Sequence, residues 1–183
     1  QDDCDLEFSL IHFTKEKKKP TLLRLDGIYF NSDQNYHSQN APIKYSYEKA
    51  DHVIFQSNFN KMLTEHWFGE HKSSSVVHNG ADLELINSID TNFIDQVLDR
   101  SIEVWSCASS WRPHKRLKDN LRYFHEKAPK NATMLVAGAN PDTSILNEYY
   151  EKTNGRINYL GELGYENLIA LYKRSTTFVH LAY

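Results

Sequence analysis

Short apolar runs alternate with segments whose apolar residues recur at helical spacing, and this alternation constrains the fold more than any other feature. Seven runs are predicted as strands, at residues 21–25, 51–56, 74–78, 102–108, 133–137, 156–160 and 176–181. Most are continuously apolar, as expected for strands that are covered on both faces. Three helical patterns lie between them: Phe59, Met62, Leu63 and Trp67; Leu117, Leu121 and Phe124; and Tyr165, Leu168, Ile169 and Tyr172. The alternation predicts an α/β chain with parallel sheets.

The segment 82–100 lacks a strong strand and contains two short helical patterns. We place a domain boundary near it, so that residues 1–94 form one Rossmann-like domain and residues 95–183 form another. Residues 138–141 and 161–164 follow predicted strand ends and contain glycine. Ligands of open α/β sheets bind beyond such strand ends, so these stretches are candidate binding loops.

Composition and charge exclude several classes of protein. The 183 residues carry 21 basic and 24 acidic side chains, a formal net charge of -3, which provides no overall attraction for nucleic acid or an anionic membrane. Any phosphate site must therefore be local. The basic run at residues 15–19 is interpreted as a solvated loop. Two cysteines, Cys4 and Cys107, provide no disulfide framework, and no run reaches the roughly 18 apolar residues that a membrane span needs.

Spacing also excludes two kinds of site. The nine histidines are scattered and show no metal-ligand spacing with cysteine or carboxylate partners, so no metal site is predicted. A dinucleotide dehydrogenase is excluded because no G-x-G-x-x-G motif follows a predicted strand.

Five short motifs follow one another in the order and spacing of a known enzyme family. They are ADHVIFQS at 50–57, VVHNGAD at 76–82, PHK at 113–115, MLVAG at 134–138 and INYLG at 157–161. Residues 166–182 add a sixth similar segment. Together they resemble the retaining GT-B glycosyltransferases of family 4. The resemblance implies that residues 1–94 belong to the acceptor-side domain and residues 95–183 to the domain that binds a nucleotide-sugar donor.

The chain departs from the family pattern at several points. Ser110 stands where the family has an arginine five residues before the lysine, while Arg112 lies three residues before Lys115. Asp26 stands where many members have a histidine. The sequence ends at Tyr183, before the family's Glu-x7-Glu signature, and the family's glycine-rich N-terminal loop is not found. The resemblance thus implies the middle of a longer protein, with both domains incomplete and little activity alone.

Lys115 is the main candidate for chemistry. A nucleotide-sugar donor leaves as a nucleoside diphosphate, so transfer needs cations or oriented N–H groups to stabilise the leaving phosphate. Lys115 is predicted at the start of a helix over 115–127, where the helix dipole favours an anion, and this arrangement works without a metal. Arg112 or Arg116 provides a planar second cation. The alternative is that all three are solvated residues of a first helical turn.

The other candidate residues lie at strand ends and turns. Gly138 and Gly161 allow a ligand to approach the backbone, or are ordinary turn glycines. The resemblance places Leu160 and Gly161 beside the nucleotide base. Asn79 and Gly80 form a turn that supports the ligand site or merely reverses the chain. Asp26 either orients an acceptor hydroxyl or pairs with Arg24. The full set of donor-binding candidates is Lys115, Arg112, Ser110, Gly138, Leu160, Gly161, Asn79 and Gly80.

The resemblance implies a hexosyltransferase-type enzyme that moves a sugar from a UDP- or GDP-sugar to an acceptor hydroxyl with retained anomeric configuration. No cofactor and no nucleic-acid partner are expected, and the acceptor is a glycan, a lipid or a protein. The expected location is the cytoplasm, with weak association with a membrane surface left open. Two alternatives remain: a non-catalytic GT-B-like binding or scaffold protein, and a sugar phosphorylase or epimerase, which needs an orthophosphate or water site that this sequence does not show.

Overall fold

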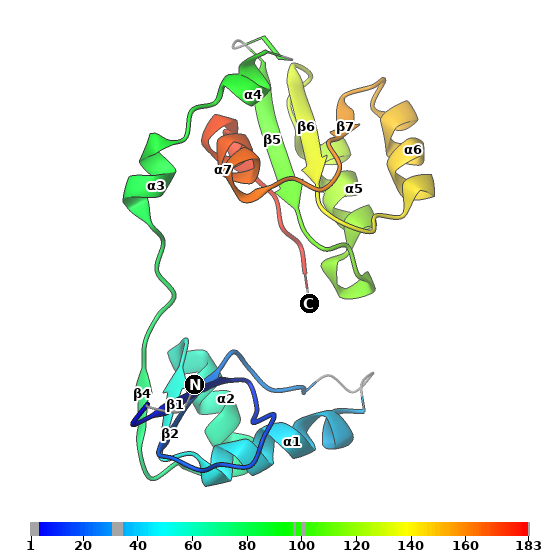
Figure 1. Cartoon of the computed structure of the whole chain (residues 1–183). Helices are drawn as coiled ribbons and strands as arrows, with labels where there is room; N and C mark the ends of the chain where they lie inside the picture. Colours follow the sequence, from blue (N-terminus) through cyan, green and yellow to red (C-terminus); the bar gives the residue numbers. More distant parts are fainter. Residues whose placement is uncertain (1–3, 31–34, 97, 100–101, 183) are drawn as a thin grey trace. The chain divides into compact units, whose positions relative to one another are not determined.

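The computed structural model describes residues 4–30, 35–96, 98–99 and 102–182. It divides into two compact units, residues 1–81 and 82–183, and each unit contains its own four-stranded parallel sheet (Figure 1). The predicted α/β fold with two separate sheets is therefore confirmed. The division falls between Ala81 and Asp82, earlier than the boundary expected near residue 94.

The first unit contains four strands and two helices. In chain order these are β1 (Glu7–Leu10), β2 (Thr21–Leu25), α1 (Tyr36–Lys49), β3 (His52–Phe55), α2 (Asn58–Phe68) and β4 (Ser74–Val76). The strands follow one another across the sheet in the order β1-β2-β3-β4. Strand β1 was not predicted, because its two apolar residues, Phe8 and Leu10, alternate with polar ones and are exposed at the sheet edge.

Among the described residues of the first unit, the helices pack against one face of the sheet. Right-handed crossovers that all run in the same direction place their helices on the same face, and Ile43 and Tyr47 of α1 share a core cluster with the strand residues Leu23 and Val53. Burial along β2 and β3 consequently alternates. The expectation that these strands are covered on both faces is wrong for this unit.

Helix α2 buries a different face from the one predicted. Phe59 and Met62 are 60% and 63% exposed, and Trp67 is exposed as well, whereas Asn60 and Thr64 are buried. The Asn60 amide donates a hydrogen bond of 2.7 Å to the Leu25 carbonyl at the end of β2. The polar pair Asn60 and Thr64 thus lies on the buried side of this helix, together with Leu63 and Phe68, which pack against the core.

The second unit contains the two longest strands of the described residues, which span Glu103–Ala108 and Ala132–Ala137. Its elements are α3 (Leu83–Ser88), α4 (Asn92–Asp95), β5 (Glu103–Ala108), the 3-10 turn η1 (Pro113–Lys115), α5 (Leu117–Lys127), β6 (Ala132–Ala137), α6 (Thr143–Lys152), β7 (Ile157–Tyr159), α7 (Tyr165–Arg174) and β8 (Thr177–Phe178). The sheet order is β7-β6-β5-β8, so the chain runs outward from β5 to β7 and then returns to the other side of β5.

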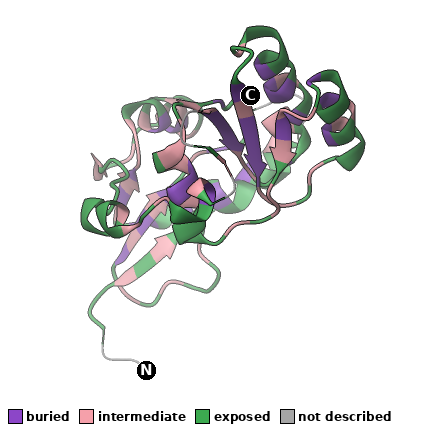
Figure 2. Cartoon of the chain, turned by 90° about the horizontal axis from the view of Figure 1, so that it is seen from above, coloured by how far each residue is buried: buried purple, intermediate pink, exposed green. Residues whose placement is uncertain are grey.

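This reversal places helices on both faces of the second sheet. Helices α5 and α6 pack on one face with Trp105 and Cys107, whereas α4 and α7 pack on the other with Val104 and Leu135. Figure 1 shows α7 and α5 on opposite sides of β5 and β6. In Figure 2 the strands carry buried residues, while the outer sides of the helices are exposed. The prediction of strands covered on both faces holds for β5 and β6, whereas the edge strands β7 and β8 are only partly buried.

The segment before β5 belongs to the second unit for a physical reason. Arg174 at the end of α7 donates from Nε to Asp95 at 3.1 Å, and Ile94 is fully buried beside Val104. Lys173 also donates to the Ile86 carbonyl. These contacts bind α3 and α4 to α7, which explains why the division precedes both helices.

Among the described residues, none of the helices has both the length and the apolar character that crossing a membrane requires.

Candidate functional site at the strand ends of the second unit

The sheet of the second unit has a switch point between β5 and β8. The connection that leaves β5 runs through α5 on one face of the sheet, and the connection that arrives at β8 runs through α7 on the other. In open α/β sheets, ligands bind beyond the carboxyl ends of the strands at such a reversal. The loop after β5 contains Ser110, Arg112 and Lys115, and the segment after β8 contains His180. The topology therefore collects most of the cationic candidates at one edge.

Trp111 anchors the loop after β5. Its backbone N–H donates to the Ala139 carbonyl at 2.9 Å, and its indole Nε1 donates to the Ala137 carbonyl at 2.9 Å. The side chain is buried against α5 and α6. Because a large buried ring with both donors satisfied has little freedom, the loop leaves the sheet at a fixed point.

Lys115 lies in the turn before α5 and not in the helix itself. Arg116 adopts a left-handed conformation, with φ 49° and ψ 51°, which ends the 3-10 turn at Lys115 and lets α5 begin at Leu117. The expectation of a helix beginning at Lys115 is thus wrong by two residues. A left-handed residue cannot continue a right-handed helix, and a helical period does not reveal its position.

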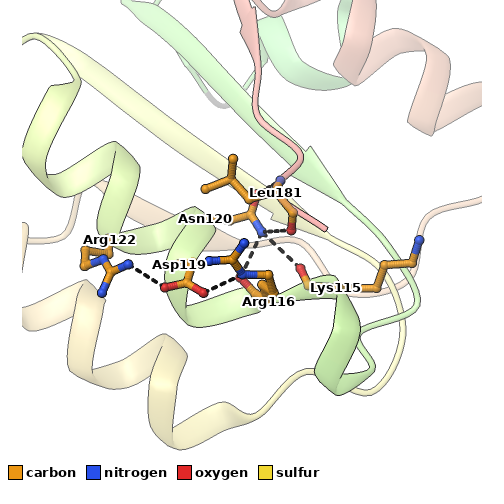
Figure 3. Close-up of polar contacts among 6 residues, drawn as sticks. All are labelled: Lys115, Arg116, Asp119, Asn120, Arg122 and Leu181. Atoms are coloured by element: carbon orange, nitrogen blue, oxygen red, sulfur yellow. Dashed lines mark hydrogen bonds and ion pairs between the residues drawn. The ribbon is translucent and has the colours of Figure 1, made fainter. Parts of the chain in front are cut away.

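Lys115 is a partly buried residue, and within the described part of the chain no acidic side chain forms an ion pair with its ammonium. In Figure 3 the side chain extends away from the cluster formed by Arg116, Asp119 and Asn120. Partial burial, together with the Lys115 charge, lowers the pKa of His180 below its usual value. Lys115 and His180, which belong to two different segments at the switch point, are therefore within electrostatic reach of each other.

Arg116 is engaged elsewhere. Its Nε donates to Asp119 at 2.8 Å, and Arg122 binds the other oxygen of the same carboxylate at 2.6 Å. The hydrogen bond from Arg116 is the largest cause that lowers the pKa of Asp119. Arg112 is exposed and lines a cavity of about 560 Å³ that also includes Arg116, Lys118 and Asp142. Lys115 does not line this cavity.

A second cavity, of about 240 Å³, lies beyond the ends of β5 and β6. Ser110 and Gly138, both predicted, contribute to its lining, and Glu162 and Tyr172 line it without having been predicted as site residues. Burial raises the pKa of Tyr172 above its usual value. Glu162 lies directly after Gly161 in the candidate binding loop 161–164, and this position at a predicted strand end could have identified it. Tyr172 was read only as part of a helical pattern.

Gly138 connects three strand-end loops. Its N–H donates to the Gly161 carbonyl at 2.8 Å, and its carbonyl accepts from the Tyr159 hydroxyl at 2.7 Å. A Cβ at Gly138 would lie 1.9 Å from the Ser109 carbonyl oxygen. Leu160 donates to the Val136 carbonyl, so Leu160 and Gly161 lie beside the end of β6. The structure brings Ser110, Gly138, Leu160 and Gly161 to one edge of the sheet.

The remaining candidates lie in the first unit. Asp26 forms an ion pair of 2.5 Å with Arg24, which is one of the two roles expected for it from the sequence. Arg24 also donates to Asn79 at 2.6 Å. Asn79 donates to Gln56, whose amide donates to the Asp26 carbonyl. These four residues close a polar network at the ends of β2, β3 and β4. Gly80 has open space around its Cβ position.

Two further observations concern chemistry. Within the described residues no group of three or more histidine, cysteine or acidic side chains could hold a metal ion. Full burial raises the pKa of the Cys107 thiol far above its usual value, so this cysteine is a packing residue rather than a nucleophile.

The comparisons with known proteins place the fold. No family model matches the chain, and no curated protein matches it. Among solved structures, HepE of Anabaena in complex with UDP has a TM-score of 0.73 at 16% identity, over 90% of this chain and 47% of HepE. Sucrose-phosphate synthase of Thermosynechococcus elongatus has a TM-score of 0.74 at 13% identity, over 92% of this chain and 46% of that enzyme. UDP-N-acetylglucosamine 2-epimerase of Rickettsia bellii has a TM-score of 0.62 at 10% identity, over 87% and 44%.

These likenesses confirm the GT-B-type fold that the motifs predicted. The chain spans less than half the length of each of these three proteins.

Proposed function

We propose that this chain is part of a retaining, family 4-type GT-B glycosyltransferase that moves a hexosyl group from a nucleotide-sugar to an acceptor hydroxyl. In this proposal the second unit binds the donor, and the first unit, with Asp26, faces the acceptor. The bond between the sugar and the diphosphate breaks, a bond between the sugar and the acceptor oxygen forms, and the acceptor proton leaves with the diphosphate. Cytoplasmic location belongs to the same proposal.

The position of Lys115 carries the proposal. Lys115 lies on the turn that follows β5, in a loop anchored by Trp111, and within the described residues no acidic side chain forms an ion pair with its ammonium. A cation held there stabilises the negative charge that develops on a leaving diphosphate without needing a metal. HepE was solved with UDP and with UDP-glucose, which supports a nucleoside diphosphate as the ligand class.

The other residues have supporting roles in this proposal. Leu160 and Gly161 offer backbone groups to the nucleotide, whereas Gly138, whose N–H and carbonyl are engaged by Gly161 and Tyr159, holds the strand-end loops together. Ser110, Gly138 and Glu162 line the cavity of about 240 Å³. Arg112 is exposed on the adjacent cavity and is a weaker second cation. Asn79 and Gly80 lie in the first unit, where Asn79 belongs to the network around Arg24, so we assign them structural support and no direct donor contact.

Lys115→Ala tests this function through ligand affinity. Calorimetric titration of UDP and GDP should show wild-type binding and a loss of affinity of about ten- to a hundredfold in Lys115→Ala, the value of one charge-assisted hydrogen bond. Lys118→Ala is the matched control, because Lys118 is an exposed lysine on the following helix that pairs with Glu148 at 3.9 Å. Equal nucleotide affinity of Lys115→Ala and wild type would overturn the role of Lys115.

Turnover separates the enzyme from the non-catalytic alternative. In the full-length protein, a UDP- or GDP-sugar labelled in the sugar should yield a glycoside whose anomeric configuration, read by NMR, matches that of the donor. Lys115→Ala should lower the rate roughly thirty- to a thousandfold. Nucleotide binding without transfer to any acceptor would favour a binding protein, and an inverted product would exclude the retaining mechanism.

A further inference from the structure

Asn120, on the first turns of α5, connects two segments that lie far apart in the sequence. Its side chain is fully buried. The two hydrogens of the amide Nδ2 are shared among three carbonyls, those of Lys115 at 3.0 Å, Arg116 at 2.9 Å and Leu181 at 3.1 Å. The amide oxygen accepts the Leu181 N–H at 2.8 Å. Figure 3 shows these bonds converging on one side chain.

Both polar atoms of the amide are needed for this arrangement. Toward Leu181 the side chain acts as donor and acceptor at once, as a neighbouring strand would, and toward Lys115 and Arg116 it acts as donor. A carboxylate of the same shape lacks the donors, and an apolar side chain lacks both functions. Without the Asn120 amide, the partly buried Lys115 carbonyl and the Leu181 N–H and carbonyl would lose these partners, whereas the Arg116 carbonyl would still accept the N–H groups of Asp119 and Asn120. A partly buried backbone group that is left without a partner costs more than its bond contributes when formed.

We call the hydrogen bonds from the Asn120 side chain to Lys115, Arg116 and Leu181 the clasp. The clasp lies just beyond the point where the pairing between β5 and β8 ends. Strand β8 pairs with β5 only at Trp105–Thr177 and Ser106–Phe178, and the Val179 N–H then donates to the Ser106 carbonyl. Beyond that point the chain leaves the sheet. Two residues after Val179, the Asn120 side chain hydrogen-bonds to Leu181 and so joins the segment after β8 to the turn that contains Lys115. His180 lies between these two attachments.

We propose that Asn120 is a positioning residue for the diphosphate site. It holds the Lys115 backbone against the segment after β8, so that the Lys115 ammonium and the His180 ring are presented to the ligand from fixed points. This inference rests on the proposed function, because the ligand whose phosphates it serves is a nucleoside diphosphate. Its physical effect is preorganisation, since a flexible lysine on a fixed backbone loses less freedom on binding than one on a mobile turn.

Three variants test the clasp. Asn120→Ala removes all four bonds. Asn120→Ser keeps a hydroxyl that can reach the Arg116 carbonyl one turn back in the helix but is too short for Leu181. Asn147→Ala is the matched control, because Asn147 is an exposed asparagine of α6. Hydrogen exchange of β5 and β6 amides shows whether each variant is folded, and exchange of the Leu181 amide shows whether the clasp is open.

The affinity for UDP then separates positioning from mere stability. Asn120→Ala and Asn120→Ser should exchange the Leu181 amide faster while the strand amides stay protected, and should bind UDP on the order of tenfold more weakly. In a Lys115→Ala background the Asn120 substitutions should change UDP affinity less than twofold, because residues that act through one another are not additive. Asn147→Ala should match wild type in both measurements.

Each contrary result has a distinct meaning. If the Leu181 amide exchanges faster but UDP binds as tightly as in wild type, or if the Asn120 loss is undiminished in the Lys115→Ala background, the positioning role is wrong and Asn120 only stabilises the fold. If Lys115→Ala weakens UDP binding while the Asn120 variants do not, this inference fails and the proposed function stands. If wild type binds neither UDP nor GDP, the proposed function fails and this inference fails with it.

Discussion

Gly138 shows how a single residue fixes the site. Its φ of +112° is a conformation that side chains rarely adopt, and its Cβ position is occupied by the Ser109 backbone. Gly161, at φ +78°, has the same kind of backbone but open space around it. Substitutions at these two glycines therefore distinguish the cost of backbone strain alone from the cost of strain together with a steric clash.

Gly138→Ala should therefore destabilise the second unit on the order of 3 kcal/mol or more, because strain and a clash with backbone act together. Gly161→Ala should cost about 1 kcal/mol, from strain alone. Urea unfolding followed by the fluorescence of Trp105 and Trp111, both buried in this unit, measures the difference. Equal free energies of unfolding for the two variants would contradict the close packing of Gly138 against the Ser109 backbone.

Tyr47 makes the first unit sensitive to alkaline pH. Burial, with smaller contributions from Glu65 and Glu70, raises the pKa of Tyr47 to about 12 from 10.0, and its hydroxyl donates to the Gly69 carbonyl at 2.8 Å. The folded state thus holds its proton more tightly than the unfolded state. Tyr47 contributes stability that is complete below pH 10 and is lost as the pH rises through about 12.

Tyr47→Phe should lower the free energy of unfolding by about 1 kcal/mol at pH 7 through the lost hydrogen bond. It should also reduce the loss of unfolding free energy between pH 10 and 12, which unfolding followed by circular dichroism at several pH values would measure. Tyr45→Phe, at an exposed position of the same helix, serves as the control. If Tyr47→Phe loses as much stability between pH 10 and 12 as wild type, other titrating groups cause that loss.

At the scale of elements, α2 is informative because it reverses the usual pattern. Its buried contacts include Asn60, which donates to the Leu25 carbonyl, and Thr64, which donates to Asn60 at 3.1 Å, while Phe59 and Met62 face outward. The Ser57 side chain caps the helix by accepting the Asn60 N–H. The polar residues of α2 therefore contribute more to the fold than its exposed apolar residues.

Asn60→Leu should accordingly destabilise the first unit by about 1–3 kcal/mol, since the buried Leu25 carbonyl loses its partner. Met62→Ser should change the stability by less than about 0.5 kcal/mol, as exposed substitutions usually do. Thermal unfolding of the two variants provides the comparison. A larger loss for Met62→Ser would show that the outward face of α2 is covered in solution.

At the scale of the whole molecule, two units have separate hydrophobic cores. The cluster around Leu23 and Phe55 belongs to residues 1–81, and the clusters around Trp105 and Val104 belong to residues 82–183. Gly138→Ala should therefore lower hydrogen-exchange protection in β5 and β6 but leave β2 and β3 unchanged. Mass spectrometry of exchanged peptides resolves both regions. A parallel loss in β2 and β3 would mean that the units unfold as one.

Much of the fold is encoded in local patterns. Strand β2 was predicted with its observed bounds, β3, β5 and β6 nearly so, and the apolar face of α5 was predicted as Leu117, Leu121 and Phe124, all buried. The alternation of strands and helices, broken at residues 82–100, predicted the two sheets. Local periodicity suffices here because a continuous apolar run or a 3.6-residue repeat is a property of neighbouring residues.

The sequence by itself determined where β2, β3, β5 and β6 form, and which residues could carry charge to a phosphate. The tertiary structure alone decided that α5 begins after a left-handed Arg116, that Asp26 pairs with Arg24, and that Asn120 joins Lys115 to Leu181. Asn120 and Leu181 are 61 residues apart, and they meet only because the strand order reverses at β5. Strand order arises from packing between distant segments, which no local repeat records.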